Sequence, residues 1–221
     1  GHNGGGVYVG ERLLRSQLLL PFEKAVKSGA ATVMTSYNQV DGIPCTSNKR
    51  LLTDILRGEW GFDGFVYSDL YSIEVIHSLG AARDTAQAAS LALKAGLDMD
   101  LGGDAFGNNL KNELDKGAIS MDDINRAVAN VLRMKFRQGL FENPYVDPKC
   151  ARTTCRSTEH IAIAEQVAEE GVVLLKNDEV LPLSRALGRI AVIGPNADTP
   201  YNQLGDYTAP QAREAICTVL D

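Results

Sequence analysis

The sequence predicts an α/β protein made of repeated strand–helix units, with the organisation of part of a (β/α)8 barrel. Three short apolar runs, at 31–37, 64–69 and 97–101, are typical of buried parallel strands. Their starts lie about 33 residues apart, which suits a repeated strand–helix–strand unit. A complete eight-stranded barrel needs about 250 residues. We therefore expect three runs to supply only a portion of one.

Helical periodicity surrounds these runs. In the segment 120–138, Ser120 is followed three residues later by Asp123, a variant of the capping box that begins helices. Glycines at 96, 117 and 139 are placed to end helices. The helices that we expect in this part of the chain cover 11–27, 48–60, 84–95, 106–116 and 120–138.

Composition shifts after this region. Residues 142–157 hold two prolines and two cysteines without periodicity, which indicates a linker. A helix at 158–170 and apolar runs at 172–175 and 190–193 follow, as in the opening of a second α/β domain. We accordingly predict a barrel portion over 1–141, a linker over 142–157 and the start of a second domain over 158–221.

Overall composition excludes several classes of protein. Hydrophobic residues make up 44% and charged residues 23% of the 221 residues, as in ordinary globular domains. The net charge of −6 and the absence of a basic run argue against a nucleic-acid partner. No apolar stretch is long enough to span a membrane. Four cysteines without a CxxC pair favour neither a disulfide scaffold nor a structural zinc site.

Candidate functional residues follow the expected strands, because parallel α/β folds bind ligands at the carboxyl ends of their strands. Tyr37 ends the first run, Asp69 ends the second, and Asp98 and Asp100 lie in the third. Asp69 could attack an electrophile or hold a sugar hydroxyl, or it could simply cap a helix beginning near Ser72. For Asp98 and Asp100 we favour a structural role, because a lone DxD is weak evidence for a metal.

The same segments resemble glycoside hydrolase family 3, the β-glucosidase and β-xylosidase family. The most specific match is VMTSYNQVDGIPCTSNKRLLTDILRGEWGFDGFVYSD. Further matches, in family order, are VGERLLRSQLLLPFEKAVKSG, LALKAGLDMDL, RMKFRQGLFENPYVDP, EEGVVLLKNDEVLPL and IAVIGPNAD. The resemblance implies the C-terminal part of the barrel followed by an α/β sandwich domain.

By motif, the resemblance implies that Asp69 is the catalytic nucleophile and that Tyr37 and Met34 line the sugar subsite. It implies a retaining, exo-acting β-glycosidase of the β-glucosidase type. The alternatives are a β-xylosidase or a truncated, non-catalytic chain. The substrate would be a small β-linked oligosaccharide or glycoside, and the two-carboxylate mechanism of the family implies no metal or organic cofactor. The compartment and the oligomeric state stay open, although many members are periplasmic or secreted.

The sequence departs from the family pattern at three points, which affect the expected leaving-group preference and the expected activity of the isolated chain. Leu70 follows the nucleophile where the family often has tryptophan, which affects preference for the leaving group. The Lys-His pair that binds the sugar would precede Gly1, and the acid/base glutamate would follow Asp221. We therefore expect the isolated chain to be inactive. A third interpretation is a different barrel enzyme in which Asp69 abstracts a proton.

Overall fold

The computed structural model describes residues 4–205 and 207–221. It divides into two compact units, Gly1–Val146 and Asp147–Asp221, which are described separately below. Within the described residues, no helix combines the length and apolarity that crossing a membrane would require.

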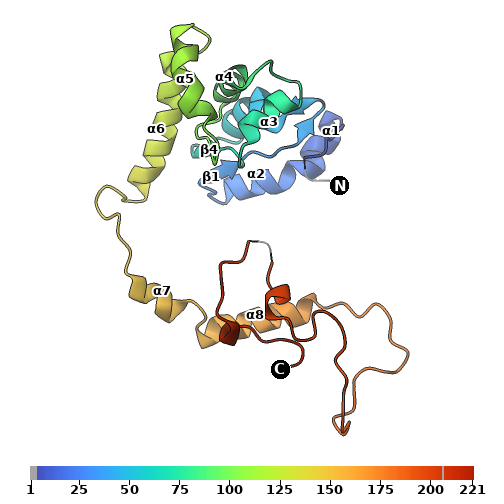
Figure 1. Cartoon of the computed structure of the whole chain (residues 1–221). Coiled ribbons are helices and arrows are strands. Elements are labelled where there is room, and N and C mark those ends of the chain that lie inside the picture. The colour runs from blue at the N-terminus through green and yellow to red at the C-terminus, as the bar shows by residue number, and fades with distance from the viewer. Residues whose placement is uncertain (1–3, 206) are drawn as a thin grey trace. The chain divides into compact units, whose positions relative to one another are not determined.

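The first unit contains a parallel pair of strands (Figure 1). Strand β1 (Thr32–Met34) pairs with β4 (Phe65–Tyr67), in a register that runs from Thr32 opposite Phe65 to Met34 opposite Tyr67. Between β1 and β4 in the sequence, β2 (Gln39–Val40) and β3 (Ile43–Pro44) form an antiparallel hairpin. The first two expected strands are confirmed, in shorter form.

The third expected strand, at 97–101, is wrong as a strand. Only Met99 pairs with the sheet, through a single parallel bridge to Tyr67. On either side of Met99 the side chains of Asp98 and Asp100 accept hydrogen bonds from the protein interior and from the next helix. Such contacts replace the regular ladder of a longer strand.

Each of the helices expected from periodicity in this part of the chain is present, and α3 (Ser72–Ser78) lies outside them, at the place near Ser72 where the sequence allows a helix to begin. The expected helix at 11–27 is divided by a π-type turn η1, and the one at 48–60 also has π-type hydrogen bonds and is labelled η3. Pro21 lies in the first turn of α2, where its missing N–H removes no helical hydrogen bond. The bounds are α1 Glu11–Leu13, η1 Leu14–Leu18, α2 Leu20–Lys27, the 3₁₀ turn η2 Cys45–Ser47, η3 Arg50–Glu59, α3 Ser72–Ser78, α4 Thr85–Ala95, α5 Ala105–Asp115 and α6 Met121–Arg137.

Local signals account for the helix ends. The Ser120 side chain accepts from the Asp123 N–H and the Asp123 carboxylate accepts from the Ser120 N–H, so the predicted capping box is confirmed. Asp84 caps α4 by accepting from the Gln87 N–H at 2.8 Å. Gly96 ends α4 with φ of +112°, a conformation that favours glycine.

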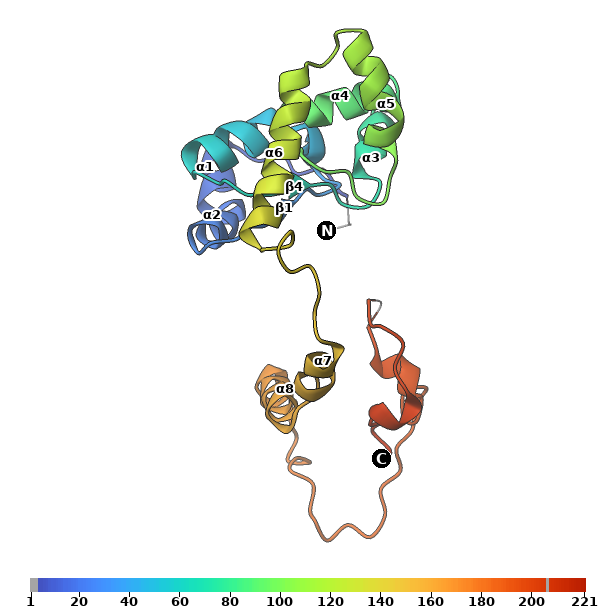
Figure 2. The same ribbon diagram turned by 90° about the vertical axis from the view of Figure 1, so that its left-hand side faces the viewer.

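The hydrophobic core of the unit lies between β4 and the helices η3, α3 and α4. Val66 of β4 is completely buried, and α5 and α6 extend this packing beside α4 (Figure 2). The core residues include Leu52, Leu56, Val66, Ile73, Ile76, Ala89 and Leu97. Because one face of β4 is buried in this core, a ligand can approach only its opposite face and its carboxyl end.

Gly64, immediately before β4, allows the two strands to approach. A Cβ atom at this position would lie 2.0 Å from the carbonyl oxygen of Ala31 and 2.7 Å from Cζ of Phe62. We predict that Gly64→Ala destabilises the protein by about 3 kcal/mol, because a backbone carbonyl must move. Unfolding in urea measures this change.

Gly107→Ala is the matched control, since nothing lies within 4 Å of that added Cβ. Alanine in place of this α5 glycine should be neutral or stabilise by up to about 1 kcal/mol. Equal unfolding midpoints for the two variants would contradict the proposed close approach at Gly64.

Among the residues that the structure describes, the second unit contains two helices, α7 (Pro148–Thr154) and α8 (Thr158–Gly171). The expected helix at 158–170 is confirmed. Helix α7 lies within residues 142–157, where the sequence indicates a linker and no helix, and Asp147 caps it by accepting from the Lys149 N–H at 2.9 Å. Two short 3₁₀ turns, η4 (Pro200–Gln203) and η5 (Arg213–Ala215), follow, and the apolar runs 172–175 and 190–193 form no strand in the described part of the chain.

Candidate active site

Parallel pairing brings the sequence-predicted residues to one edge of the sheet. Met34 ends β1, Tyr37 lies three residues beyond it, and Asp69 follows β4 by two residues. The backbone N–H of Thr35 donates to the carbonyl of Tyr67 at 2.9 Å, which extends the pairing past the strand ends. The structure therefore places Met34, Tyr37 and Asp69 on segments that leave the same edge.

A tight turn presents Asp69. The carbonyl of Asp69 accepts from the Ser72 N–H at 3.1 Å, and the Tyr71 N–H donates to the carbonyl of Leu101 at 3.2 Å. Tyr71 has a φ of +58°, a left-handed conformation that is uncommon for a residue with a side chain. These backbone contacts therefore hold the turn on the C-terminal side of Asp69.

The alternative role of Asp69 as a helix cap is wrong. Helix α3 begins at Ser72, and its N-cap residue is Tyr71, with no side-chain cap. Asp69 is half-buried, and within the described residues its carboxylate accepts one hydrogen bond, from the Leu70 N–H to Oδ1 at 2.7 Å. A carboxylate with spare acceptor capacity and no ion-pair partner among these residues is free to act on a ligand.

Tyr37 reaches the same turn. Its hydroxyl donates to the carbonyl of Leu70 at 2.7 Å, next to Asp69 in the chain. A phenol carries a single proton, so this hydrogen bond and donation to the Asp69 carboxylate are alternatives. Met34 is 47% exposed.

Asp98 has the structural role that the sequence favours. Its fully buried carboxylate accepts from the Val66 N–H at 2.8 Å, from Nδ2 of Asn130 at 3.0 Å and from the Arg57 guanidinium. Burial raises the pKa of the Asp98 carboxyl, and these three donors oppose that effect. The contacts join β4 to η3 and α6 beneath the site.

Asp100 is also used within the fold. Its Oδ2 accepts from the Phe106 N–H at 3.1 Å, and its Oδ1 lies 3.4 Å from the hydroxyl of Ser68. Ser68 is fully buried and accepts from the Leu101 N–H at 2.8 Å. These bonds connect the residue before Asp69 to the neighbouring segment.

We predict that Asp98→Ala lowers the free energy of unfolding by about 3–5 kcal/mol, because it leaves the Arg57 charge buried without its partner. Thermal or urea unfolding provides the measurement. Asp115→Ala is the control, since that exposed carboxylate pairs with Lys111 within α5 and such pairs contribute about 0.5 kcal/mol or less. A loss at Asp98 as small as at Asp115 would show that the buried contacts are not stabilising.

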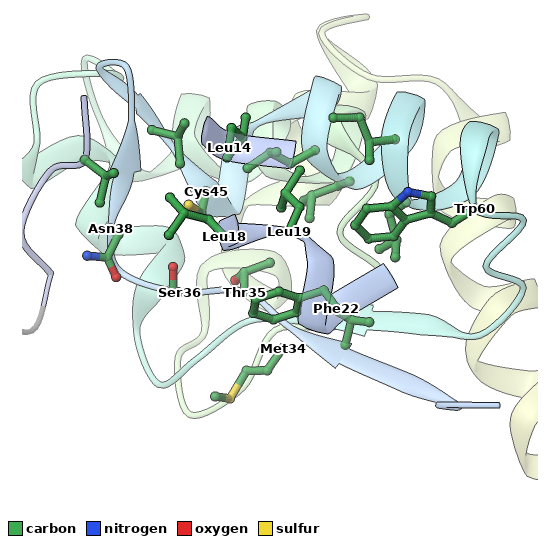
Figure 3. A pocket seen from close by; sticks show the side chains of 17 residues that line it. Leu14, Leu18, Leu19, Phe22, Met34, Thr35, Ser36, Asn38, Cys45 and Trp60 are labelled. Atoms are coloured by element: carbon green, nitrogen blue, oxygen red, sulfur yellow. The ribbon is translucent and has the colours of Figure 1, made fainter. Parts of the chain in front are cut away.

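A separate groove of about 330 Å³ lies between η1 and α2, β1 and η3 (Figure 3). Met34 lines it, but neither Asp69 nor Tyr37 does. Its lining is mostly apolar, whereas a sugar needs hydrogen-bonding partners for its hydroxyl groups. The lining includes Leu14, Leu18, Leu19, Phe22, Leu52, Ile55 and Trp60. We therefore locate the candidate site at the strand ends and not in this groove.

A model of the glycosyl hydrolase family 3 N terminal domain matches residues 1–134, and a model of the C-terminal domain of the same family matches residues 172–221. The chain belongs to glycosyl hydrolase family 3. The match includes every candidate site residue in the first unit.

Family 3 relatives carry both names that the sequence suggests. A periplasmic β-glucosidase of Salmonella typhimurium is 37% identical over 90% of this chain and 27% of its own length. A β-xylosidase of Formosa agariphila is 39% identical over 94% of this chain and 30% of its own length. The chain thus spans less than a third of each relative.

Solved family 3 structures confirm the predicted fold class. A β-glucosidase from Listeria innocua is 35% identical with a TM-score of 0.81, covering 90% of this chain and 28% of its own. A β-glucosidase involved in saponin metabolism from intestinal bacteria is 37% identical with a TM-score of 0.85, covering 92% of this chain and 27% of its own. Such similarity agrees with part of a (β/α)8 barrel followed by the start of an α/β sandwich.

The sequence does not predict the buried hydroxyl groups beside the Asp69 turn. Ser72 and Thr46 form buried hydrogen bonds close to the candidate site, and neither belongs to an evident catalytic pattern. Thr46 lies in the short turn η2, 26 residues before Ser72. Only the folded arrangement shows that these hydroxyl groups meet.

Proposed function

We propose that the complete protein containing this chain is a retaining, exo-acting β-glycosidase of the β-glucosidase type, with Asp69 as its nucleophile. The observation that carries the proposal is the position of Asp69 in a family 3 chain. Its carboxylate lies just past a parallel strand, is held by backbone contacts and forms no ion pair among the described residues. Such a carboxylate is available to attack an anomeric carbon.

The proposed reaction has two steps. An Asp69 carboxylate oxygen bonds to the anomeric carbon while the bond to the leaving-group oxygen breaks and a general acid protonates that oxygen. Water then attacks the anomeric carbon of the glycosyl ester, giving its proton to the same acid/base group and releasing Asp69. Two inversions produce net retention. We assign the acid/base group to a part of the complete protein outside residues 1–221.

Tyr37 and Met34 would border the sugar. The hydrogen bond from the Tyr37 hydroxyl to the Leu70 carbonyl fixes the ring beside the Asp69 turn. The exposed Met34 side chain offers an apolar contact to a sugar ring face. We propose substrate binding, without a proton-transfer role, for both residues.

The proposed domain organisation follows from the same assignment. Residues 1–141 would supply the C-terminal portion of the barrel, 142–157 the connection, and 158–221 the start of the α/β sandwich. The family matches at 1–134 and 172–221 support this division.

A β-xylosidase is the second candidate. A β-xylosidase of Formosa agariphila and a probable β-D-xylosidase of Arabidopsis thaliana are 39% and 36% identical to this chain. Leu70 at the exposed end of the turn lacks the bulk of an aromatic side chain and would affect the leaving-group side in either enzyme. Small β-linked glycosides of glucose and xylose are the substrates to compare.

We predict that Asp69→Ala in the complete protein lowers kcat on 4-nitrophenyl β-glucoside or β-xyloside by on the order of 10⁴-fold, because the covalent step loses its nucleophile. Added azide should enter the space left by the carboxylate and yield the α-glycosyl azide. Release of 4-nitrophenol measures the rate, and NMR identifies the azide product.

Asp54→Ala is the control, because that exposed carboxylate pairs only with Lys49 among the described residues. It should keep the activity of the unchanged protein. Near-normal hydrolysis by Asp69→Ala would contradict the assignment of Asp69 as the nucleophile. Release of the sugar with inverted configuration by the unchanged protein would exclude retention.

A further inference from the structure

Three buried hydroxyl groups meet next to the candidate site. The Oγ1 atom of Thr46 lies 3.0 Å from Oγ1 of Thr35 and 3.1 Å from Oγ of Ser72, and the Thr35 and Ser72 oxygens are 3.5 Å apart. All three residues are at most 4% exposed. We call these residues the hydroxyl triangle.

The hydroxyl triangle joins the two segments that carry the proposed site residues, the Met34–Tyr37 arm after β1 and the Asp69 turn after β4. Thr35 directly follows Met34 and precedes Tyr37 by two residues, whereas Ser72 follows Asp69 by three. Their backbones also bracket the turn, because the Thr35 N–H donates to the Tyr67 carbonyl and the Ser72 N–H donates to the Asp69 carbonyl. Because only a few residues separate the hydroxyl triangle from Tyr37 and from Asp69, a displacement of the triangle would move both side chains.

Thr46 is the central member. It comes from the separate turn η2 and has the shortest contacts to both other oxygens. Its hydroxyl is also 3.4 Å from the carbonyl of Ser36, which lies on the arm that carries Tyr37. A single hydroxyl at this position therefore touches the Met34–Tyr37 segment and the start of α3.

Apolar side chains would fill this space without the need to satisfy buried polar atoms. Hydroxyl groups add directional contacts, and a closed set of three strengthens each hydrogen bond through its neighbours. We propose that the hydroxyl triangle positions Asp69 relative to the Met34–Tyr37 arm, with Thr46 as the principal positioning residue. The proposal rests on the glycosidase function proposed above.

The test uses the complete protein with Thr46→Val, which keeps the shape of the side chain and removes the hydroxyl, and with Thr46→Ser, which keeps the hydroxyl. Thr46→Val should lower kcat by about 10- to 100-fold, the effect expected of a small displacement of a reacting group. Its KM should change by less than roughly threefold, because sugar-binding groups stay present. Thr46→Ser should retain activity within about threefold of the unchanged protein.

Ser90→Ala is the matched control. Ser90 is 6% exposed and its hydroxyl bonds to Glu113 and Ala86 between α4 and α5, among residues outside the proposed site. It should lose stability comparable to Thr46→Val and keep kcat. All rates are measured well below the unfolding temperature of each variant.

Normal kcat in Thr46→Val, or an equal loss in Thr46→Ser, would overturn the positioning role. If Thr46→Val yields no folded protein, Ser72→Ala removes a single oxygen atom and must show the same loss of kcat with KM little changed. The unchanged protein and Asp69→Ala are assayed beside these variants. If the unchanged protein and Asp69→Ala are equally inactive, the glycosidase proposal fails and the positioning role fails with it. If Asp69→Ala loses activity while Thr46→Val keeps the kcat of the unchanged protein, the positioning role alone fails.

Discussion

The parallel pairing of β1 with β4 is the constraint on which the rest of the first unit depends. It places Met34 opposite Tyr67, so the segments leaving the two strands start from the same edge. The pairing requires Gly64, where the backbone of one segment meets that of the other. Burial of Val66 against the helices then fixes which face of β4 is core. The position of Asp69 follows from this register.

Buried polar groups then fix the surroundings of the strand ends. Asp98 joins the centre of β4 to η3 and α6, and Asp100 connects Ser68 to the start of α5. Each acceptor is paired with donors, as burial of a charge demands. The carboxylate of Asp69 differs from both, because backbone hydrogen bonds hold its turn and leave the side chain available. This contrast distinguishes the structural carboxylates of Asp98 and Asp100 from Asp69, the proposed nucleophile.

Local signals in the sequence predicted much of this arrangement. The capping box at Ser120, the stop at Gly96 and the first two strand runs act over a few residues, so they can be recognised without the fold. The third run forms one bridge and no strand, because the Asp98 carboxylate accepts from the Val66 N–H, a donor of β4 that a longer ladder would use. Helix α7 was missed because a single cap at Asp147 starts it in a segment rich in proline and cysteine.

The candidate site divides in the same way. Asp69 and Tyr37 end strand runs, and their motifs resemble a known family, so both could be named from sequence. The triangle of Thr35, Thr46 and Ser72 could not, because three ordinary hydroxyl residues from separate segments meet only after folding. The bond from Tyr37 to the Leu70 carbonyl likewise depends on how the turn closes.

The central claim is that Asp69 forms the covalent bond to the sugar. The most direct measurement treats the complete protein with activated 2-deoxy-2-fluoro-β-glucoside and 2-deoxy-2-fluoro-β-xyloside, then maps the labelled peptide by mass spectrometry. The account predicts one glycosyl adduct, on Asp69, with the faster-reacting sugar indicating the substrate. An adduct on another carboxylate, or none in a folded protein that hydrolyses β-glycosides, would contradict it.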